Sequence, residues 1–303
     1  MLVAVSLAYI AYSLYNTIGD IELLNIFRQM QGNVILFLLL AVTATFSIGF
    51  AWKLNLEFLS NKKLRTIETF NIFLKAGFSR YLPGNIMQYV ARNLYAEQIG
   101  ITQTKMATGS MLEIILITFT TFVLALAFGG SQLFSLIVEY IPVVMFTIII
   151  AVLLVFACIA MVILRKTKHC ERIRSNFAEQ FRDIKASSFL VFSAKMFGLV
   201  TYNHIIIGIT FWLMLSASSG ITDINFFMVV SACIVAWFVG FITPVAPAGI
   251  GVKEAVLSLF LIDTFGGYVL ICAILLRVVL MLAELSTFCI VALINSQVVW
   301  EKS

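Results

Sequence analysis

Charged residues are scarce in this chain of 303 residues. Asp, Glu, Lys and Arg together make up 12% of it, whereas ordinary soluble domains have about 25%. Hydrophobic residues make up 61%, and the mean hydropathy is +1.04. This composition excludes an ordinary soluble domain. We predict an all-α polytopic membrane protein in which residues 1–303 form a single membrane domain, with no room for a soluble catalytic domain.

The residues and motifs that carry most enzyme chemistry are also scarce. The chain has two histidines, neither in a zinc-binding context, and its five cysteines are scattered without metal-ligand spacing. It lacks a P-loop and a nucleophile-elbow serine. We therefore predict no enzyme activity, no metal and no cofactor. The net charge of +5 reflects basic loops beside apolar runs, so nucleic acid is not an expected partner.

Long apolar runs are plentiful, and a membrane-spanning helix needs about 20 such residues. Uninterrupted runs lie at 1–18, 33–52, 106–128, 136–164, 188–216 and 267–293, which predicts about six full spans. The first run lacks a basic flank and a convincing cleavage site, so we expect it to be retained as a span.

Basic residues in the loops orient these spans. The loops 53–67 and 165–187 are rich in Lys and Arg, whereas 19–32, 129–135 and 217–224 carry few or none. Because cytoplasmic loops are enriched in basic residues, the first two are expected to be cytoplasmic and the other three to face outward. The expected location is the plasma (inner) membrane.

Two further apolar stretches, 68–104 and 225–263, are interrupted by helix-breaking residues. The first contains Pro83 and Gly84, and the loop orientation requires it to enter and leave on the cytoplasmic side. We therefore predict a re-entrant helical hairpin. The second contains Pro244, Pro247, Gly249 and Gly251. It is expected to be a second re-entrant hairpin, although one kinked full span with an outward C-terminus stays open.

With both hairpins, the chain reads as span–hairpin–span at 33–128, followed by span–hairpin–span at 188–293 in the opposite orientation. Such an inverted repeat, with broken helices facing each other at mid-membrane, is a transporter layout. It places the C-terminus in the cytoplasm.

The helix breaks suggest an anion site. Each break starts a half-helix near the membrane centre, and the unpaired N–H groups at a helix N-terminus attract anions. Asn85, Gln88 and Arg92 share one face of the first half-helix, whereas Lys253 and Glu254 lie in the first turn of the second. With Arg80 they would form a positive pocket for a phosphate-bearing head group, which arginine holds in a bidentate way.

Ionisable residues within membrane spans cost free energy to bury, so they are candidates for a functional role. Glu113 follows the first hairpin, and Arg277 and Glu284 follow the second. Structural ion pairs, Arg277–Glu284 or an arginine with Glu113, remain an equal alternative to substrate contact. Arg80 and Arg92 could instead be interfacial anchors. Arg80 could also form an ion pair with Glu113 or Glu284. His204 is expected to be a hydrogen-bonded helix contact.

The two break motifs carry a family resemblance. The segments RYLPGNIMQYVAR (80–92) and TPVAPAGIGVKEA (243–255) resemble the flippase-like transmembrane domain of the lysylphosphatidylglycerol synthase family. The similarity covers roughly 30–295, and the chain is similar to stand-alone members without the synthase domain. The resemblance implies lipid movement across the bilayer, and its matching motif positions are Pro83, Gly84, Gln88, Arg92, Pro247, Gly249, Gly251 and Glu254.

The expected function is a flippase that moves an anionic lipid, a phospholipid or a polyprenyl-phosphate-linked sugar, by alternating access. The alternative is a non-transporting partner subunit of a membrane glycosyltransferase. Membrane lipids are the expected partners, and self-association or a glycosyltransferase partner stays open. The predicted substrate-binding residues are Arg80, Pro83, Gly84, Asn85, Gln88, Arg92, Glu113, Pro247, Gly249, Gly251, Lys253, Glu254, Arg277 and Glu284.

Overall fold

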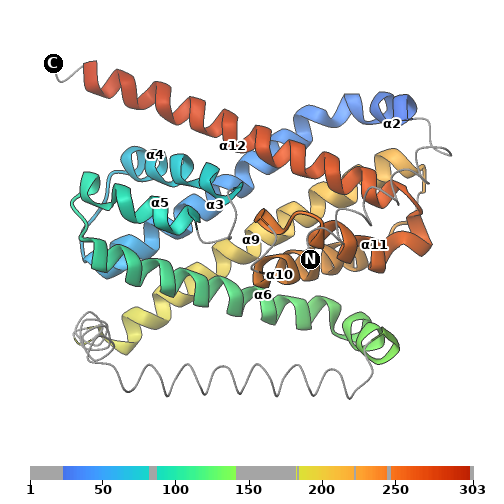
Figure 1. The fold of residues 1–303 in the computed structure, drawn as a ribbon, viewed down its shortest axis with the longest axis horizontal. Coiled ribbons are helices and arrows are strands. Elements are labelled where there is room, and N and C mark those ends of the chain that lie inside the picture. The colour runs from blue at the N-terminus through green and yellow to red at the C-terminus, as the bar shows by residue number, and fades with distance from the viewer. Residues whose placement is uncertain are drawn as a thin grey trace. The chain divides into compact units, whose positions relative to one another are not determined.

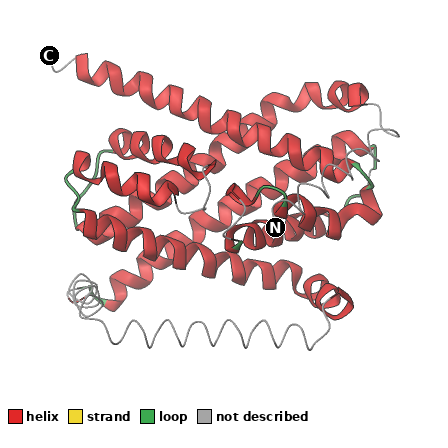
Figure 2. Cartoon of the chain, viewed as in Figure 1, coloured by secondary structure: helices red, strands yellow, loops and turns green. Residues whose placement is uncertain are grey.

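A computed structural model describes residues 23–81, 87–140, 182, 184–221, 223–243 and 247–300. Every regular element in these residues is helical, as predicted, and they contain no strand (Figures 1 and 2). The elements are α2 (Leu23–Met30), η1 (Gln31–Asn33), α3 (Val34–Ser60), α4 (Thr66–Gly77), η2 (Phe78–Tyr81), α5 (Met87–Tyr95), η3 (Ala96–Ile99), α6 (Gln103–Tyr140), α9 (Ala186–Ser219), α10 (Phe226–Ile242), η4 (Pro247–Gly249), α11 (Val252–Phe265) and α12 (Tyr268–Trp300).

Tertiary contacts divide the chain into two units, Met1–Phe128 with Phe192–Ser303, and Gly129–Val191. The first unit is the larger one, and it contains both interrupted stretches. The structure does not test the prediction of a single membrane domain.

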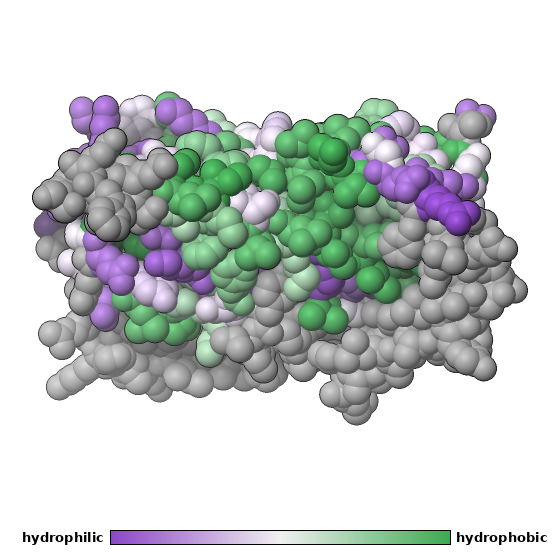
Figure 3. Space-filling model, turned by 90° about the horizontal axis from the view of Figure 1, so that it is seen from above, coloured by the Kyte–Doolittle hydropathy of each residue, from purple (hydrophilic) through white to green (hydrophobic). Residues whose placement is uncertain are grey.

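Four of the helices are long and apolar enough to cross a membrane. They span Arg28–Ser60, Gln103–Gly129, Ala186–Ser219 and Tyr268–Ile294, which match four of the six predicted spans. The predicted span at 1–18 lies outside the described residues, and most of 136–164 does so too. Hydrophobic side chains gather over the middle of the face shown in Figure 3. The chain is therefore a multi-pass, all-helical membrane protein in its described part.

The first interrupted stretch forms two short helices that pack on each other. α4 and α5 are in contact, and the 3-10 turn η2 continues α4 up to Tyr81. The connection 82–86, with the predicted turn at Pro83 and Gly84 and with Asn85, lies outside the described residues. α5 is only nine residues long, or about 13 Å at 1.5 Å per residue, too short to cross a bilayer.

The second interrupted stretch also forms two packed helices. Asn225 caps α10 by accepting a hydrogen bond from the Met228 amide at 3.2 Å. The chain then breaks at η4, where Gly249 and Gly251 have φ of 70° and 85°, values that glycine adopts without strain. α11 starts at Val252 and packs against α10. Two helices, α10 and α11, therefore lie on either side of the break that the sequence predicted.

The two interrupted stretches meet inside the larger unit. η2 contacts η4, so the end of α4 and the start of α11 lie close together although they are far apart in the sequence. α12 packs against α4 of the first hairpin and against α11 of the second, and also against α3 (Figure 1). This arrangement brings the polar residues of both breaks to one place.

Candidate functional site

A cavity of about 250 Å³ lies where the two breaks meet. Its walls come from α3, α4, η2, α5, α6, α9, α10, η4, α11 and α12. Six of the predicted site residues line it: Arg80, Gln88, Arg92, Glu113, Lys253 and Glu284. The remaining described ones do not: Pro247, Gly249 and Gly251 belong to the break itself, and Glu254 and Arg277 pair with each other. The sequence motifs thus converge on one internal space.

Arg92 and Glu113 form a deeply buried ion pair between α5 and α6. The Nη1 atom of Arg92 donates to both carboxylate oxygens of Glu113, at 3.0 and 2.9 Å, and each residue is only 2% exposed. The guanidinium carbon also lies 4.7 Å from the ring centre of Phe73 and 5.2 Å from that of Trp52. Aromatic faces attract cations, so this site holds Arg92 in place. An interfacial anchor role for Arg92 is therefore wrong.

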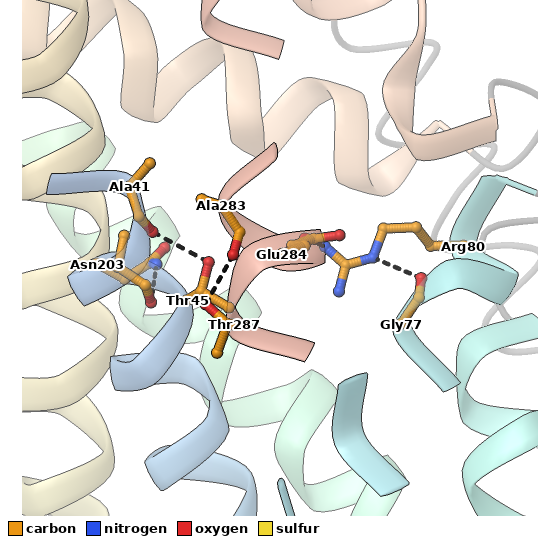
Figure 4. A network of polar contacts seen from close by, with 9 residues as sticks. Ala41, Thr45, Gly77, Arg80, Asn203, Ala283, Glu284 and Thr287 are labelled. Carbon is orange, nitrogen blue, oxygen red and sulfur yellow. Dashed lines mark hydrogen bonds and ion pairs between the residues drawn. The ribbon is translucent and has the colours of Figure 1, made fainter. Parts of the chain in front are cut away.

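Arg80 pairs with Glu284, one of the two acids named as candidate partners. Its Nη1 lies 2.7 Å from Glu284 Oε1, and its Nε donates to the Gly77 carbonyl oxygen at 3.1 Å (Figure 4). The pair joins η2 to α12. The Arg80 side chain is 28% exposed and that of Glu284 is 16% exposed, so this pair is more accessible than Arg92–Glu113.

Arg277 pairs with Glu254, which joins α12 to α11. The other carboxylate oxygen of Glu254 accepts a hydrogen bond from the Gly251 amide at 2.8 Å. Of the two structural ion pairs that the sequence left open, Arg277–Glu284 is therefore not formed, whereas an arginine paired with Glu113 is present as Arg92–Glu113. Residues seven apart on a helix are separated by about 10 Å along its axis. Arg277 and Glu284 therefore each pair with a residue of a neighbouring hairpin, Glu254 and Arg80 respectively.

Lys253 has a different environment from the arginines. Its aliphatic stem lies in a slot between two glycines: a Cβ on Gly240 would be 2.6 Å from Lys253 Cγ, and one on Gly249 would be 2.8 Å from its Cε. Its Nζ lies 6.0 Å from the ring centre of Trp237. The ion pairs found among the described residues do not include Lys253. Its ammonium group therefore lacks a carboxylate partner there.

α9 contributes two polar residues to the cavity wall. Asn203 Nδ2 donates to the Ala44 carbonyl oxygen at 3.0 Å and so ties α9 to α3. One ring nitrogen of His204 lies 2.8 Å from the Val200 carbonyl oxygen, and the other lies 3.3 Å from Thr121 Oγ1 on α6. His204 thus makes the hydrogen-bonded helix contact that the sequence predicted.

Sequence reasoning missed the residues that shape the cavity around its charges. Gly240 is one of several glycines in apolar helices, and only the enrichment of small residues at membrane helix interfaces could have pointed to it. Tyr89 and Trp237 also line the cavity, but aromatic residues occur throughout this chain. In the described part of the chain, no group of three or more His, Cys, Asp or Glu side chains is placed to hold a metal ion.

The charges on the cavity wall are unequal. Three cations, Arg80, Arg92 and Lys253, face two acids, Glu113 and Glu284. Two of the cations are ion-paired, which leaves the charge of Lys253 as the excess. In a low-dielectric surrounding, an uncompensated cation binds an anion strongly.

Comparisons with family models, curated proteins and solved structures find no match to this chain.

Proposed function

We propose that this protein is a flippase that moves an anionic lipid, a phospholipid or a polyprenyl-phosphate-linked sugar, between membrane leaflets by alternating access. The head group would enter the cavity between the two helix breaks, while the acyl or prenyl chains stay in the bilayer. The observation that carries the proposal is the Lys253 ammonium, which faces an internal cavity without a carboxylate partner among the described residues.

The position of the neighbouring arginine supports this proposal. Arg80 and Lys253 line the same cavity, and the Arg80 pair with Glu284 is the more accessible of the two ion pairs there. A phosphate that binds to Lys253 could take a hydrogen bond from the remaining N–H groups of Arg80, because a guanidinium has five donors. Arg92 is less suited to direct contact because Glu113 and aromatic rings surround it.

The proposed topology is six spans with two re-entrant hairpins arranged as an inverted repeat, with a cytoplasmic C-terminus in the plasma membrane. The pairing of the ionisable residues supports the repeat. In each half, an ion pair joins the second hairpin helix to the long helix that follows: Arg92 to Glu113, 21 residues apart, and Glu254 to Arg277, 23 residues apart. In the first half the arginine precedes the glutamate in the sequence, whereas in the second half the glutamate precedes the arginine. Together with the break motifs, this supports relationship to the flippase-like domain that the sequence resembles.

A leaflet assay tests the proposed function. Purified protein is reconstituted in vesicles that contain fluorescent phosphatidylglycerol, and the lipid exposed outside is bleached with dithionite. We expect wild-type protein to make nearly all of the label accessible and Lys253→Met to lose this effect. Lys105→Met is the matched control, because Lys105 lies at the start of α6 and does not line the cavity. Equal rates for wild type and Lys253→Met contradict the proposal.

The competing function is a non-transporting subunit of a membrane glycosyltransferase. One observation favours it: both arginines of the cavity are already held by carboxylates, as in a protein that uses ion pairs only to join helices. Such a subunit would show no flipping in the vesicle assay, and it would co-purify with its enzyme partner. A lipid whose mass changes would instead indicate an enzyme.

A further inference from the structure

We propose a second lipid site, outside the central cavity, in a groove between α3 and α9 that binds the phosphate of an anionic phospholipid from the surrounding bilayer. The groove has a volume of about 500 Å³. Its wall on α3 consists of Phe50, Lys53, Leu54 and Glu57, and its wall on α9 consists of Lys195, Gly198 and Leu199. It shares no residue with the central cavity.

Two contacts between the antiparallel helices α3 and α9 flank the groove. On one side of it, Asn203 on α9 donates to the carbonyl oxygen of Ala44 on α3 at 3.0 Å. On the other side, the rings of Phe58 on α3 and Phe192 on α9 stack with centroids 4.1 Å apart. Between these two contacts Gly198 has no side chain, and a Cβ built on it meets nothing within 4 Å. The helices are therefore held at both ends of an open space.

The charges in the groove favour an anion. Lys195 is exposed and is not a member of any ion pair found in the described part of the chain. Lys53 lies 3.4 Å from Glu57 Oε1, an oxygen that also accepts a hydrogen bond from the Leu64 amide at 2.8 Å. A lysine ammonium has three donors, so Lys53 keeps donors for a phosphate.

The position along α3 fits a lipid head group. Lys53 is seven residues before the end of α3, or about 10 Å along the helix axis, and is followed by a turn with the exposed Lys62 and Lys63. Lysine side chains near helix ends reach toward the head-group region, and basic pockets between membrane helices bind anionic head groups. The apolar side chains of Phe50, Leu54 and Leu199 offer a surface for the acyl chains.

Native mass spectrometry of the purified full chain tests this site, with dioleoylphosphatidylglycerol as the probe and dioleoylphosphatidylcholine as the neutral comparison. The Lys253→Met variant serves as the background, so that lipid in the central cavity does not contribute. We expect this background to retain phosphatidylglycerol in preference to phosphatidylcholine. Adding Lys53→Gln and Lys195→Gln should weaken retention about fivefold for each lysine.

Two further variants separate the groove from general surface charge. Gly198→Trp adds bulk where the structure is open and should also displace the lipid, while size-exclusion profile and melting temperature stay unchanged. Lys62→Gln with Lys63→Gln removes the same charge outside the groove and should leave retention unchanged. Equal retention after Lys53→Gln and Lys195→Gln, equal loss in the Lys62 and Lys63 control, or equal binding of phosphatidylcholine would each overturn the site. Loss of phosphatidylglycerol in the Lys253→Met background alone would assign the lipid to the central cavity instead.

Discussion

One nitrogen of Arg92 donates hydrogen bonds to both carboxylate oxygens of Glu113, and the two residues are each 2% exposed. The pair joins the second helix of the first hairpin to the long helix that follows it. Few charged pairs are removed from water so completely, because burial costs each ion several kcal/mol that only its partner and further hydrogen bonds offset. Substitutions in this pair are therefore expected to report mainly on the stability of the protein and not on substrate binding.

Removal of one member of this pair should destabilise the protein. Glu113→Gln leaves the Arg92 guanidinium without its counter-charge in a buried site, which is expected to lower the free energy of unfolding by about 3–5 kcal/mol. Melting of the purified protein in detergent measures the change. The double variant Arg92→Met with Glu113→Leu leaves no buried charge and should recover most of the loss. A double variant as unstable as the single one would mean that the aromatic contacts of Arg92, and not the ion pair, hold the two helices.

Arg80 should behave differently from Arg92 because its pair with Glu284 is partly exposed. Arg80→Gln is expected to change stability by only on the order of 1 kcal/mol, since water can solvate Glu284 in the cavity. Flipping of fluorescent phosphatidylglycerol should nevertheless be lost, and Arg80→Lys, which keeps the charge without the planar fork, should be impaired too. If Arg80→Gln melts early and Glu284→Gln rescues it, Arg80 is structural.

Gly240 should matter because it shapes the slot that positions Lys253. Gly240→Ala places a Cβ 2.6 Å from Lys253 Cγ, so the lysine must move. Flipping should fall toward the level of Lys253→Met, whereas overpacking should cost about 1–3 kcal/mol of stability. The control is Gly32→Ala, because a Cβ there meets nothing within 4 Å.

A second substitution separates crowding from misfolding at Gly240. Adding Lys253→Ala removes the side chain that the new methyl group meets, so the melting temperature should return toward that of the wild type. Flipping should stay absent, because the cation is gone. Recovered flipping in the double variant would show that Lys253 does not bind the substrate.

The proposed topology is testable by labelling. In a cysteine-free background, Lys63→Cys and Ser303→Cys should react with a membrane-impermeant maleimide only from the cytoplasm, and Asp223→Cys only from outside. The reason is the difference in basic residues between the loops. Labelling of Ser303→Cys from outside would remove the second re-entrant hairpin and the inverted repeat with it.

Local sequence patterns were enough to predict where this chain forms long helices and where the second interrupted stretch breaks. Apolar runs near 33–52, 106–128, 188–216 and 267–293 predict the four spanning helices, because hydropathy and helix length act within one segment. The break after Ile242 follows from prolines and glycines in the same way, through backbone conformations local to a few residues. The intramembrane ionisable residues were also visible, since each is conspicuous against its apolar neighbours.

Which of those residues meet depends instead on how the helices pack. Arg80 pairs with Glu284, which is 204 positions away in the sequence. Arg277 pairs with Glu254 on α11 and not with Glu284 on its own helix. Such choices depend on the rotation and neighbours of packed helices, which no local pattern encodes. The slot for Lys253 has the same origin: Gly240 lies beside it because α10 and α11 pack together, and that contact leaves the ammonium group facing the cavity.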